Sequence, residues 1–459
     1  MLGLVQLGFA ATQEIGESAL KRAFRVENKD TSGMQISFQL PEYKLSTAAL
    51  GAASYQRIEM EGASFLSSTG MPELPFFSTS LAVPATGSVK VEVLSASQRV
   101  ISGFMAYPVQ EDFESDQPKG ISVNSDYYHN GGDYPTAALQ YGDPQIMREL
   151  RIVNIQVNPF IYNAVSQQLT IHDQISLRIS FGGGQGINEL GARPLQLSPS
   201  FASMYESLIL NYDDYRGAML ANVPPRILII YGNSTDTTYL TAINDFALWK
   251  RQKGAEVNLA STATGQAGNS TTSIKNYIQS QYDNLNTRPD FVILIGDVSG
   301  SFAIPAFTVS NGGGDYPYTH LAGNDGLGDC FIGRISAEST DQLSTILAKG
   351  YLLERNLNTS TASWLNRMLL VGDWNPSGIS CMYINKYIKE ISSEVNFHYS
   401  YTEIYGDAPS PASMNTALNQ GMGVFNFRGY INMSGWSPSE SSLYNGYMLP
   451  HSVIITCAT

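Results

Sequence analysis

Apolar and polar positions alternate with a period of two in many segments between about residue 14 and residue 185. Such alternation is typical of strands that bury one face and expose the other. Turns rich in glycine, proline and asparagine separate the alternating segments. The pattern predicts an all-β domain over 14–185, folded as an antiparallel sandwich. The clearest predicted strands are 33–40, 88–94, 150–157, 168–171 and 175–181.

From residue 226 the pattern changes to short, continuous apolar runs that alternate with helical periodicity. Alternating strands and helices predict parallel sheets with helices on both faces. We therefore expect an α/β region of two consecutive parallel-sheet subdomains, 226–357 and 358–459. The predicted strands are 227–232, 256–260, 291–297, 330–335, 368–373, 401–405, 423–430 and 452–459, and the predicted helices are 239–253, 272–284, 340–356, 381–395 and 411–420.

Two further segments are set apart by their composition. A glycine-rich break and the pair Pro224-Pro225 enclose a mixed segment, which we interpret as an inter-domain connector over 186–225. The first residues, 1–13, resemble the apolar end of a signal peptide. Because no basic residue precedes them, they also fit a truncated start or an apolar first strand.

Composition and charge narrow the class of protein. Only 15% of the 459 residues are charged, and the net charge is −13. An acidic chain is disfavoured as a nucleic-acid partner, so its charge serves solubility or, alternatively, calcium binding. No other apolar run approaches the length that spans a membrane. Together with the signal-like start, this favours a secreted or cell-surface protein.

The chain has three cysteines, Cys330, Cys381 and Cys457, without the spacing of a zinc site. Cys457 lies at the end of the last predicted strand. In open α/β sheets, reacting groups gather at the carboxyl ends of the strands. Cys457 is thus a candidate nucleophile or, alternatively, an inert core thiol. The other two are expected to be core or surface thiols.

A thiol nucleophile normally needs a histidine as its base. His451 precedes Cys457 by six residues on one predicted strand, roughly 20 Å away at the usual rise per residue. It therefore cannot form a dyad with Cys457 in that strand. His320 and His398 could approach Cys457 only through tertiary folding.

Carboxylates occur at two kinds of position. Asp297 and Asp373 each follow a glycine at the end of a predicted strand, where an acid can orient a base, hold a cation or cap a helix. Asp315, Asp325 and Asp329 lie in one polar loop and offer oxygen ligands for a structural calcium ion. That loop lacks the EF-hand spacing, so ordinary turn chemistry is the alternative.

Five short motifs lie along the chain beside the apolar strand that ends in Cys457: GMPELP at 70–75, LAVP at 81–84, NPFIYN at 158–163, IGDV at 295–298 and DCFIGRIS at 329–336. These motifs and the order of the predicted elements resemble the gingipain family of cysteine peptidases, relatives of caspases and legumains, over nearly the whole chain. The N-terminal half resembles the family's β-sandwich propeptide, and the second half resembles its catalytic domain.

The resemblance implies a role for each site residue. Cys457 stands at the position of the nucleophile, and Asp373 resembles the acid that orients the family's histidine. The family pattern Asn-Tyr-x-Gly-His-Gly reads Asn-Phe-Arg-Gly-Tyr-Ile at 426–431, so Tyr430 occupies the histidine position. Phenols titrate near pH 10, which makes tyrosine a poor base at neutral pH. Backbone amides from Gly429 to Ile431 are expected to stabilise an oxyanion.

The resemblance thus implies a secreted cysteine endopeptidase precursor that acts on proteins or peptides, with 14–185 as an intramolecular prosegment and no required cofactor. The prosegment would assist folding and block the cleft until a cut within 186–226, a range that contains Arg216 and Arg226. The chain ends two residues after Cys457, which implies a catalytic domain truncated after the nucleophile strand. The alternatives are an enzyme with another base and a catalytically inactive binding protein on the same scaffold.

Overall fold

The computed structural model describes residues 23–457, except for 61–62, 112–119, 191–195, 220–222, 310–311, 356–358, 376–377, 395–397, 440 and 447. The signal-peptide prediction for 1–13 lies outside these residues. The chain separates into two compact units, one formed mainly by 16–110 with 121–344 and the other mainly by 345–459, and each is described by itself. Among the helices of the described residues, none has the length and apolar character needed to cross a membrane.

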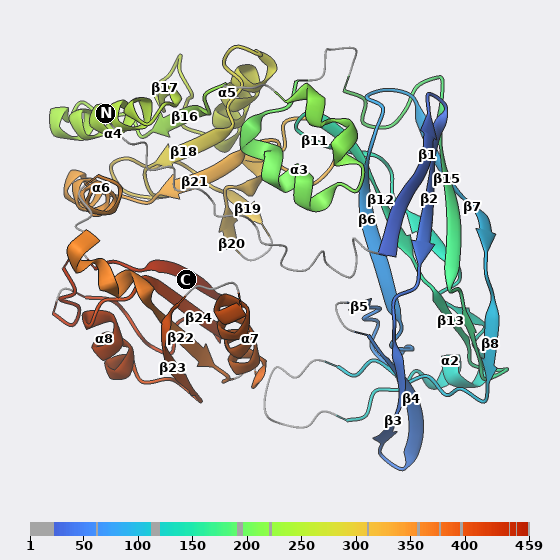
Figure 1. Ribbon diagram of the computed structural model, residues 1–459. Coiled ribbons are helices and arrows are strands. Elements are labelled where there is room, and N and C mark those ends of the chain that lie inside the picture. The colour runs from blue at the N-terminus through green and yellow to red at the C-terminus, as the bar shows by residue number, and fades with distance from the viewer. Residues whose placement is uncertain are drawn as a thin grey trace. The chain divides into compact units, whose positions relative to one another are not determined.

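The first part of the larger unit is built from antiparallel sheets (Figure 1). The strand orders are β1-β2-β15-β7, β10-β12-β6-β5, β8-β14-β13-β9 and the separate hairpin β3-β4, and β11 also pairs with β12. The strands are β1 (Phe24–Asp30), β2 (Gly33–Gln39), β3 (Lys44–Leu50), β4 (Ala53–Glu59), β5 (Ser64–Phe65), β6 (Pro75–Val83), β7 (Ser88–Ala96), β8 (Arg99–Ser102), β9 (Asp133–Tyr134), β10 (Leu139–Tyr141), β11 (Gln145–Met147), β12 (Leu150–Val157), β13 (Phe160–Asn163), β14 (Gln168–Ile171) and β15 (Gln174–Gly182). A short helix, α2 (Ser125–Asn130), lies between β8 and β9.

One hydrophobic core joins the three larger sheets. Ile36 of β2, Phe77 of β6, Val153 of β12 and Leu169 of β14 are all fully buried in the same cluster. The alternation of buried residues along β2 and β15 follows the period of two, so each strand turns one face to this core. The predicted strands of this half thus match observed strands within about two residues at each end.

Between residues 197 and 219, the connector is folded rather than loose. It contains α3 (Ala202–Leu208) and three 3₁₀ turns, η1 (Pro199–Phe201), η2 (Tyr212–Asp214) and η3 (Arg216–Ala218). Phe201, Tyr205 and Ile209 are buried in one cluster with Met147 at the end of β11 and with Leu150 and Ile152 at the start of β12. A segment with this much buried apolar surface is held in place by the hydrophobic effect, so it does not act as a flexible linker.

The second part of this unit is an α/β fold with a parallel sheet in the order β17-β16-β18-β21. Leu228, Ile230, Val292 and Leu294 on one face pack against the helix that carries Ile274 and Ile278. A small antiparallel pair, β19-β20, precedes the last strand. The elements are β16 (Arg226–Tyr231), α4 (Thr237–Gln252), β17 (Glu256–Ser261), α5 (Thr271–Asp283), β18 (Phe291–Ile295), β19 (Phe307–Val309), β20 (Gly312–Gly314), η4 (Tyr316–Thr319), β21 (Phe331–Ile335) and α6 (Thr340–Glu354), which belongs to the second unit from Thr345 on.

The C-terminal unit has a parallel sheet in the order β23-β22-β24-β25 between two helices, α7 and α8 (Figure 1). Phe425 and Phe427 of the third strand point toward α8, whereas Asn426 between them bonds a side chain of α7. This alternation places the two helices on opposite faces. The elements are η5 (Thr359–Asn366), β22 (Arg367–Asp373), α7 (Ser380–Glu394), β23 (Ser400–Gly406), α8 (Pro411–Asn419), β24 (Val424–Ile431) and β25 (His451–Cys457). Every strand and helix predicted after residue 226 is confirmed within about two residues.

Candidate active site

Three predicted site residues lie at the carboxyl edge of the C-terminal sheet. β22 ends at Asp373, β24 ends just after Tyr430, and β25 ends at Cys457. Ile431 pairs with Cys457 across the last two strands. Because neighbouring strands lie about 4.8 Å apart, the strands of Asp373 and Cys457 are roughly 10 Å apart with β24 between them. Of Cys457 the structure describes the backbone, which places the residue but not its thiol.

Asp373 is buried, and both of its carboxylate oxygens accept hydrogen bonds. Oδ1 accepts from the backbone N–H of Asn375 at 3.0 Å and of Ala408 at 3.2 Å. Oδ2 accepts from the hydroxyl of Ser434. The carboxylate therefore ties the ends of β22 and β23 to the turn that follows β24.

That turn has an unusual backbone. Asn432 and Ser434 both have left-handed φ angles, +58° and +55°, which are strained for residues other than glycine. The hydroxyl of Thr456 donates to the carbonyl of Asn432 at 2.9 Å, and the indole of Trp436 donates to Asn415 at 2.7 Å. Bonds from β22, β25 and α8 thus hold a strained turn beside Asp373.

Ser434 was not predicted as a site residue from the sequence. Its only local signal is the run of small and polar residues from Asn432 to Gly435, which marks a turn but no partner. The bond to Asp373 joins residues 61 positions apart.

Gly429 lies where a larger residue would not fit. A Cβ atom on it would meet the ring of Phe427 at 2.9 Å and the Cβ atom of Asp373 at 3.6 Å. The absence of a side chain lets β24 pass close to the acid. The next residue, Tyr430, is 41% exposed, so its side chain is accessible at this edge.

The histidines of this unit lie at the opposite edge of the sheet. His451 is the first residue of β25, and His398 precedes the start of β23. In a parallel sheet both positions belong to the amino edge. The remaining cysteines are buried: Cys381 lies on α7, and Cys330 lies next to β21 with its pKa raised to about 12 by desolvation.

The structure does not bring the three predicted calcium ligands together. Asp315 forms a two-bond ion pair with Arg334. Asp325 accepts N–H bonds from Ile146 and Leu327, and Asp329 accepts them from Leu321, Ala322 and Arg148. Within the described ranges, no group of three or more acidic, histidine or cysteine side chains is arranged to hold a metal ion. The ion pair and hydrogen bonds of these carboxylates are those of turn and pairing chemistry.

Asp329 is fully buried. Desolvation raises the pKa of its carboxyl to about 6, although three backbone N–H donors act in the opposite direction. Burial therefore favours the protonated form of this acid more than water does.

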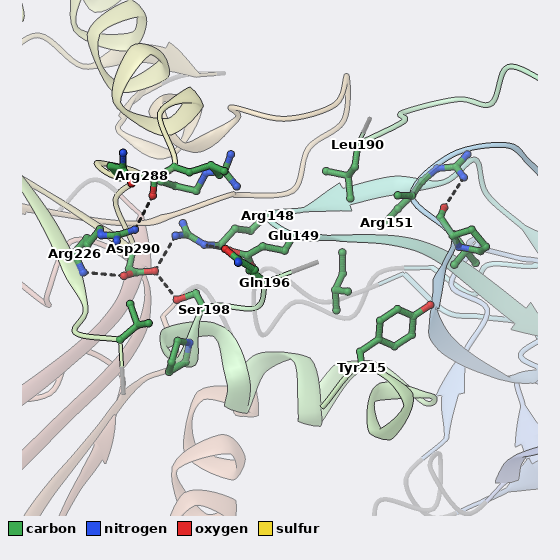
Figure 2. A pocket seen from close by; sticks show the side chains of 18 residues that line it. Arg148, Glu149, Arg151, Leu190, Gln196, Ser198, Tyr215, Arg226, Arg288 and Asp290 are labelled. Atoms are coloured by element: carbon green, nitrogen blue, oxygen red, sulfur yellow. Dashed lines mark hydrogen bonds and ion pairs between the residues drawn. The ribbon is translucent and has the colours of Figure 1, made fainter. Parts of the chain in front are cut away.

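A second polar cluster joins the N-terminal β part to the first α/β part (Figure 2). The guanidinium of Arg148 donates to Asp290 at 2.8 Å, and Asp290 also accepts from Ser198 at 2.5 Å and from the backbone N–H of Arg226 at 2.8 Å. Burial raises the pKa of the neighbouring Glu149, and its ion pair with Arg148 opposes that shift. A cavity of about 480 Å³ lies beside this cluster.

Comparison with known proteins divides the chain at the connector. The sequence model of the C25 propeptide matches residues 22–218, and that of peptidase family C25 matches residues 221–459. Arg148 and Ser198 therefore belong to the propeptide match, and Asp290 and Asp373 to the peptidase match.

Among curated proteins, Gingipain R1 of Porphyromonas gingivalis is 26% identical over 474 aligned residues, covering 98% of this chain and 46% of that protein. Lys-gingipain HG66 of the same species is 26% identical over 89% of this chain and 24% of its own length. One chain of a solved complex of the Porphyromonas gingivalis RgpB pro- and mature domains is also similar. The alignment covers 42% of this chain and 97% of the matched chain, at 23% identity and a TM-score of 0.38. The chain thus spans about half the length of Gingipain R1 and about a quarter of the length of Lys-gingipain HG66. It belongs to peptidase family C25, the gingipain family of cysteine peptidases, and carries the family's propeptide region ahead of its peptidase region.

Proposed function

We propose that this chain is the precursor of a secreted cysteine-type endopeptidase in which Cys457 is the nucleophile. One observation carries the proposal: the strands that end in Cys457 and Asp373 reach the same edge of the C-terminal sheet. Both strands lie within the residues that match the peptidase family. We further propose that the two parallel sheets form a caspase-like catalytic domain and that the N-terminal sheets form the sandwich of the prosegment.

In the proposed reaction, the Cys457 thiolate attacks the carbonyl carbon of a peptide bond. The electron pair of the carbonyl moves onto its oxygen, and backbone N–H groups between Gly429 and Ile431 stabilise that oxyanion. Collapse of the intermediate expels the amine, which takes up the proton that the Cys457 thiol gave up, and water then hydrolyses the thioester to release the acid and the thiol. In this scheme we propose a holding role for Asp373, which its hydrogen bond from Ser434 in the turn after β24 supports.

The choice of base separates the two candidate functions. Tyr430 stands where the family has histidine, and the two histidines of the C-terminal unit lie at the far edge of its sheet. Asp373 already accepts three hydrogen bonds, one of them from Ser434. These observations favour the second candidate, an inactive peptidase scaffold that serves as a surface or secretion-associated binding protein.

Maturation is proposed to occur by a cut in the connector. Arg216 lies on the exposed turn η3, where it pairs with Glu206 and Asp213. Arg226 is a poorer position for cleavage, since it begins β16 and its N–H is bonded to Asp290. A protease needs an extended segment, so we expect the cut outside the packed stretch 197–212.

The test is labelling of the connector-cleaved protein with a peptidyl electrophile, followed by mass-spectrometric mapping. Cys457→Ala is the nucleophile control, and Tyr430→His restores the family's base at an accessible position. Buried Cys330 serves as an internal control for non-specific alkylation. Labelling of Cys457 in the native chain supports the peptidase. Labelling gained only in Tyr430→His supports the inactive scaffold, and labelling in neither protein argues against the nucleophile assignment.

A further inference from the structure

Arg148 occupies a position that normally favours glycine. It forms, with Glu149, the two-residue turn between β11 and β12, in which Met147 pairs with Leu150. Its φ angle is +54°, and tight hairpin turns place glycine or asparagine at such positions. A strained arginine in this turn indicates that its side chain has a role which glycine could not fill.

The partners of that side chain lie in the peptidase region. One terminal nitrogen donates to the carbonyls of Pro289 at 2.6 Å and Asp329 at 2.9 Å, and the other donates to Asp290 at 2.8 Å. The backbone N–H of Arg148 donates to the carboxylate of Asp329 at 2.8 Å. The side chain is only 3% exposed. Both the charge and the turn are thus bound by peptidase residues Pro289, Asp290 and Asp329.

The connector closes this site from the outside. Phe201 holds its ring 5.1 Å from the guanidinium carbon, within the range of a cation–π contact. Ser198 bonds the same Asp290 oxygen that receives Arg148. Figure 2 shows Arg148, Ser198 and Arg226 converging on Asp290 from three segments of the chain. A desolvated arginine at the centre of such a contact is typical of an interface hot spot.

Other bonds across the same surface are weaker in kind. Asp325 accepts from the backbone N–H of Ile146 at 2.8 Å and from the amide of Asn188 at 3.3 Å. Asn188 in turn accepts from the N–H of Asn324 at 2.8 Å. These donors are neutral, whereas Arg148 brings a buried charge that Glu149 pairs within the prosegment and that Asp290 pairs only while the two regions stay together.

We propose that Pro289, Asp290 and Asp329 form an arginine-binding site on the peptidase region and that Arg148 is the residue by which the prosegment docks there. The ligand class is an arginyl side chain presented on a tight hairpin turn. None of these residues belongs to the segment 345–459 that carries Cys457 and Asp373. The proposal therefore rests on the division into propeptide and peptidase regions and not on the activity of Cys457.

The experiment uses the full chain with a recognition sequence for a site-specific protease inserted after Met219, between the two family regions. The chain is nicked, diluted, and followed by size-exclusion chromatography to measure how fast the two parts separate. Arg148→Gly removes the guanidinium and suits the left-handed turn, and Arg148→Lys keeps only the charge. Arg99→Ala is the matched control, since it removes an arginine from a surface pair with Asp173 inside the prosegment.

We expect the nicked Arg148→Gly protein to dissociate at least ~100-fold faster than the parent, because truncating a buried, hydrogen-bonded charge acts mainly on the dissociation rate. Arg148→Lys should lie in between, and Arg99→Ala should match the parent. Millimolar ethylguanidinium should slow dissociation of Arg148→Gly, and tetramethylammonium at equal concentration should not. A parent-like rate for Arg148→Gly, or equal acceleration by Arg99→Ala, would overturn the proposal. Should Arg148→Gly fail to fold, Asp290→Asn tests the same site from the other side: at least ~10-fold faster separation supports it, and an unchanged rate refutes it.

Discussion

Two buried asparagines fasten α7 to the sheet that carries the candidate active site. The amide of Asn385 donates to the carbonyls of Val371 at 3.0 Å and Cys381 at 2.8 Å. Its oxygen accepts from the amide of Asn426 at 2.8 Å. Asn385 is fully buried and Asn426 nearly so. Val371 lies two residues before Asp373, and Asn426 lies four residues before Tyr430. These hydrogen bonds therefore support the ends of both strands.

Asn385→Ala should destabilise the sheet by about 2–4 kcal/mol. The variant leaves the amide of Asn426 buried without its acceptor, which costs about 1–3 kcal/mol, and it opens a small cavity that adds about 1 kcal/mol. Asn426→Ala should cost less, about 1–2 kcal/mol, because Asn385 keeps both of its carbonyl partners. The double variant removes the orphaned amide, so we expect it to be about as stable as Asn385→Ala alone.

The assay is hydrogen exchange read by mass spectrometry on peptides from α7, β22 and β24. It reports local opening free energies, which suits a chain of several domains better than a single unfolding midpoint. Lys386→Ala, one residue along α7 on its exposed side, is the control and should change opening by less than about 0.5 kcal/mol. Strictly additive effects of the two asparagine variants, or an Asn385→Ala effect no larger than that of the control, would refute the reasoning.

Three other predictions concern single side chains. Cys330, whose pKa is raised to about 12 by burial, should resist iodoacetamide at pH 8 until the chain is unfolded, and its native alkylation at the rate of a free thiol would contradict that assignment. The Asp329 carboxyl, with a pKa raised from 3.8 to about 6, contributes stability that is fully present below about pH 4 and is lost as the pH rises through 6, at most about 3 kcal/mol. Melting temperatures between pH 4 and 8 should therefore show a fall that is shallower in Asp329→Asn, and equal slopes would exclude this source. Gly423→Ala should cost at least about 2 kcal/mol, because its Cβ would meet a backbone carbonyl oxygen at 2.1 Å; Gly333→Ala, with open space around it, is the control, and equal thermal stability of the two variants would count against the packing argument.

The strands and helices of this protein were predictable because each has a local pattern of apolar and polar residues. A period of two marks β2 and β15, and continuous apolar runs mark β18 and β22. Parallel connectivity then forces the ends of β22, β24 and β25 onto one edge. For that reason the shared edge of Asp373 and Cys457 follows from the order of strands and helices along the chain.

The connector shows where local periodicity falls short. Its glycine and proline boundaries predicted a linker, yet Phe201, Tyr205 and Ile209 are buried against β12. A short amphipathic segment reveals an apolar face but not the surface that covers it. Burial of that face depends on residues about 50 or more positions away along the chain.

The sequence by itself determined the strands and the helices. It also determined that the strands carrying Asp373, Tyr430 and Cys457 end at the same edge of the sheet. Only the tertiary structure decided which polar side chains bond to one another. Ser434 donates to Asp373, and Arg148 donates to Asp290, which lies 142 positions away. Periodicity encodes which face of an element is buried, because that depends on neighbours one turn or two residues away. A single buried charge leaves no repeating pattern in the sequence. Its partner can therefore be identified only from the folded structure, which brings the two side chains together.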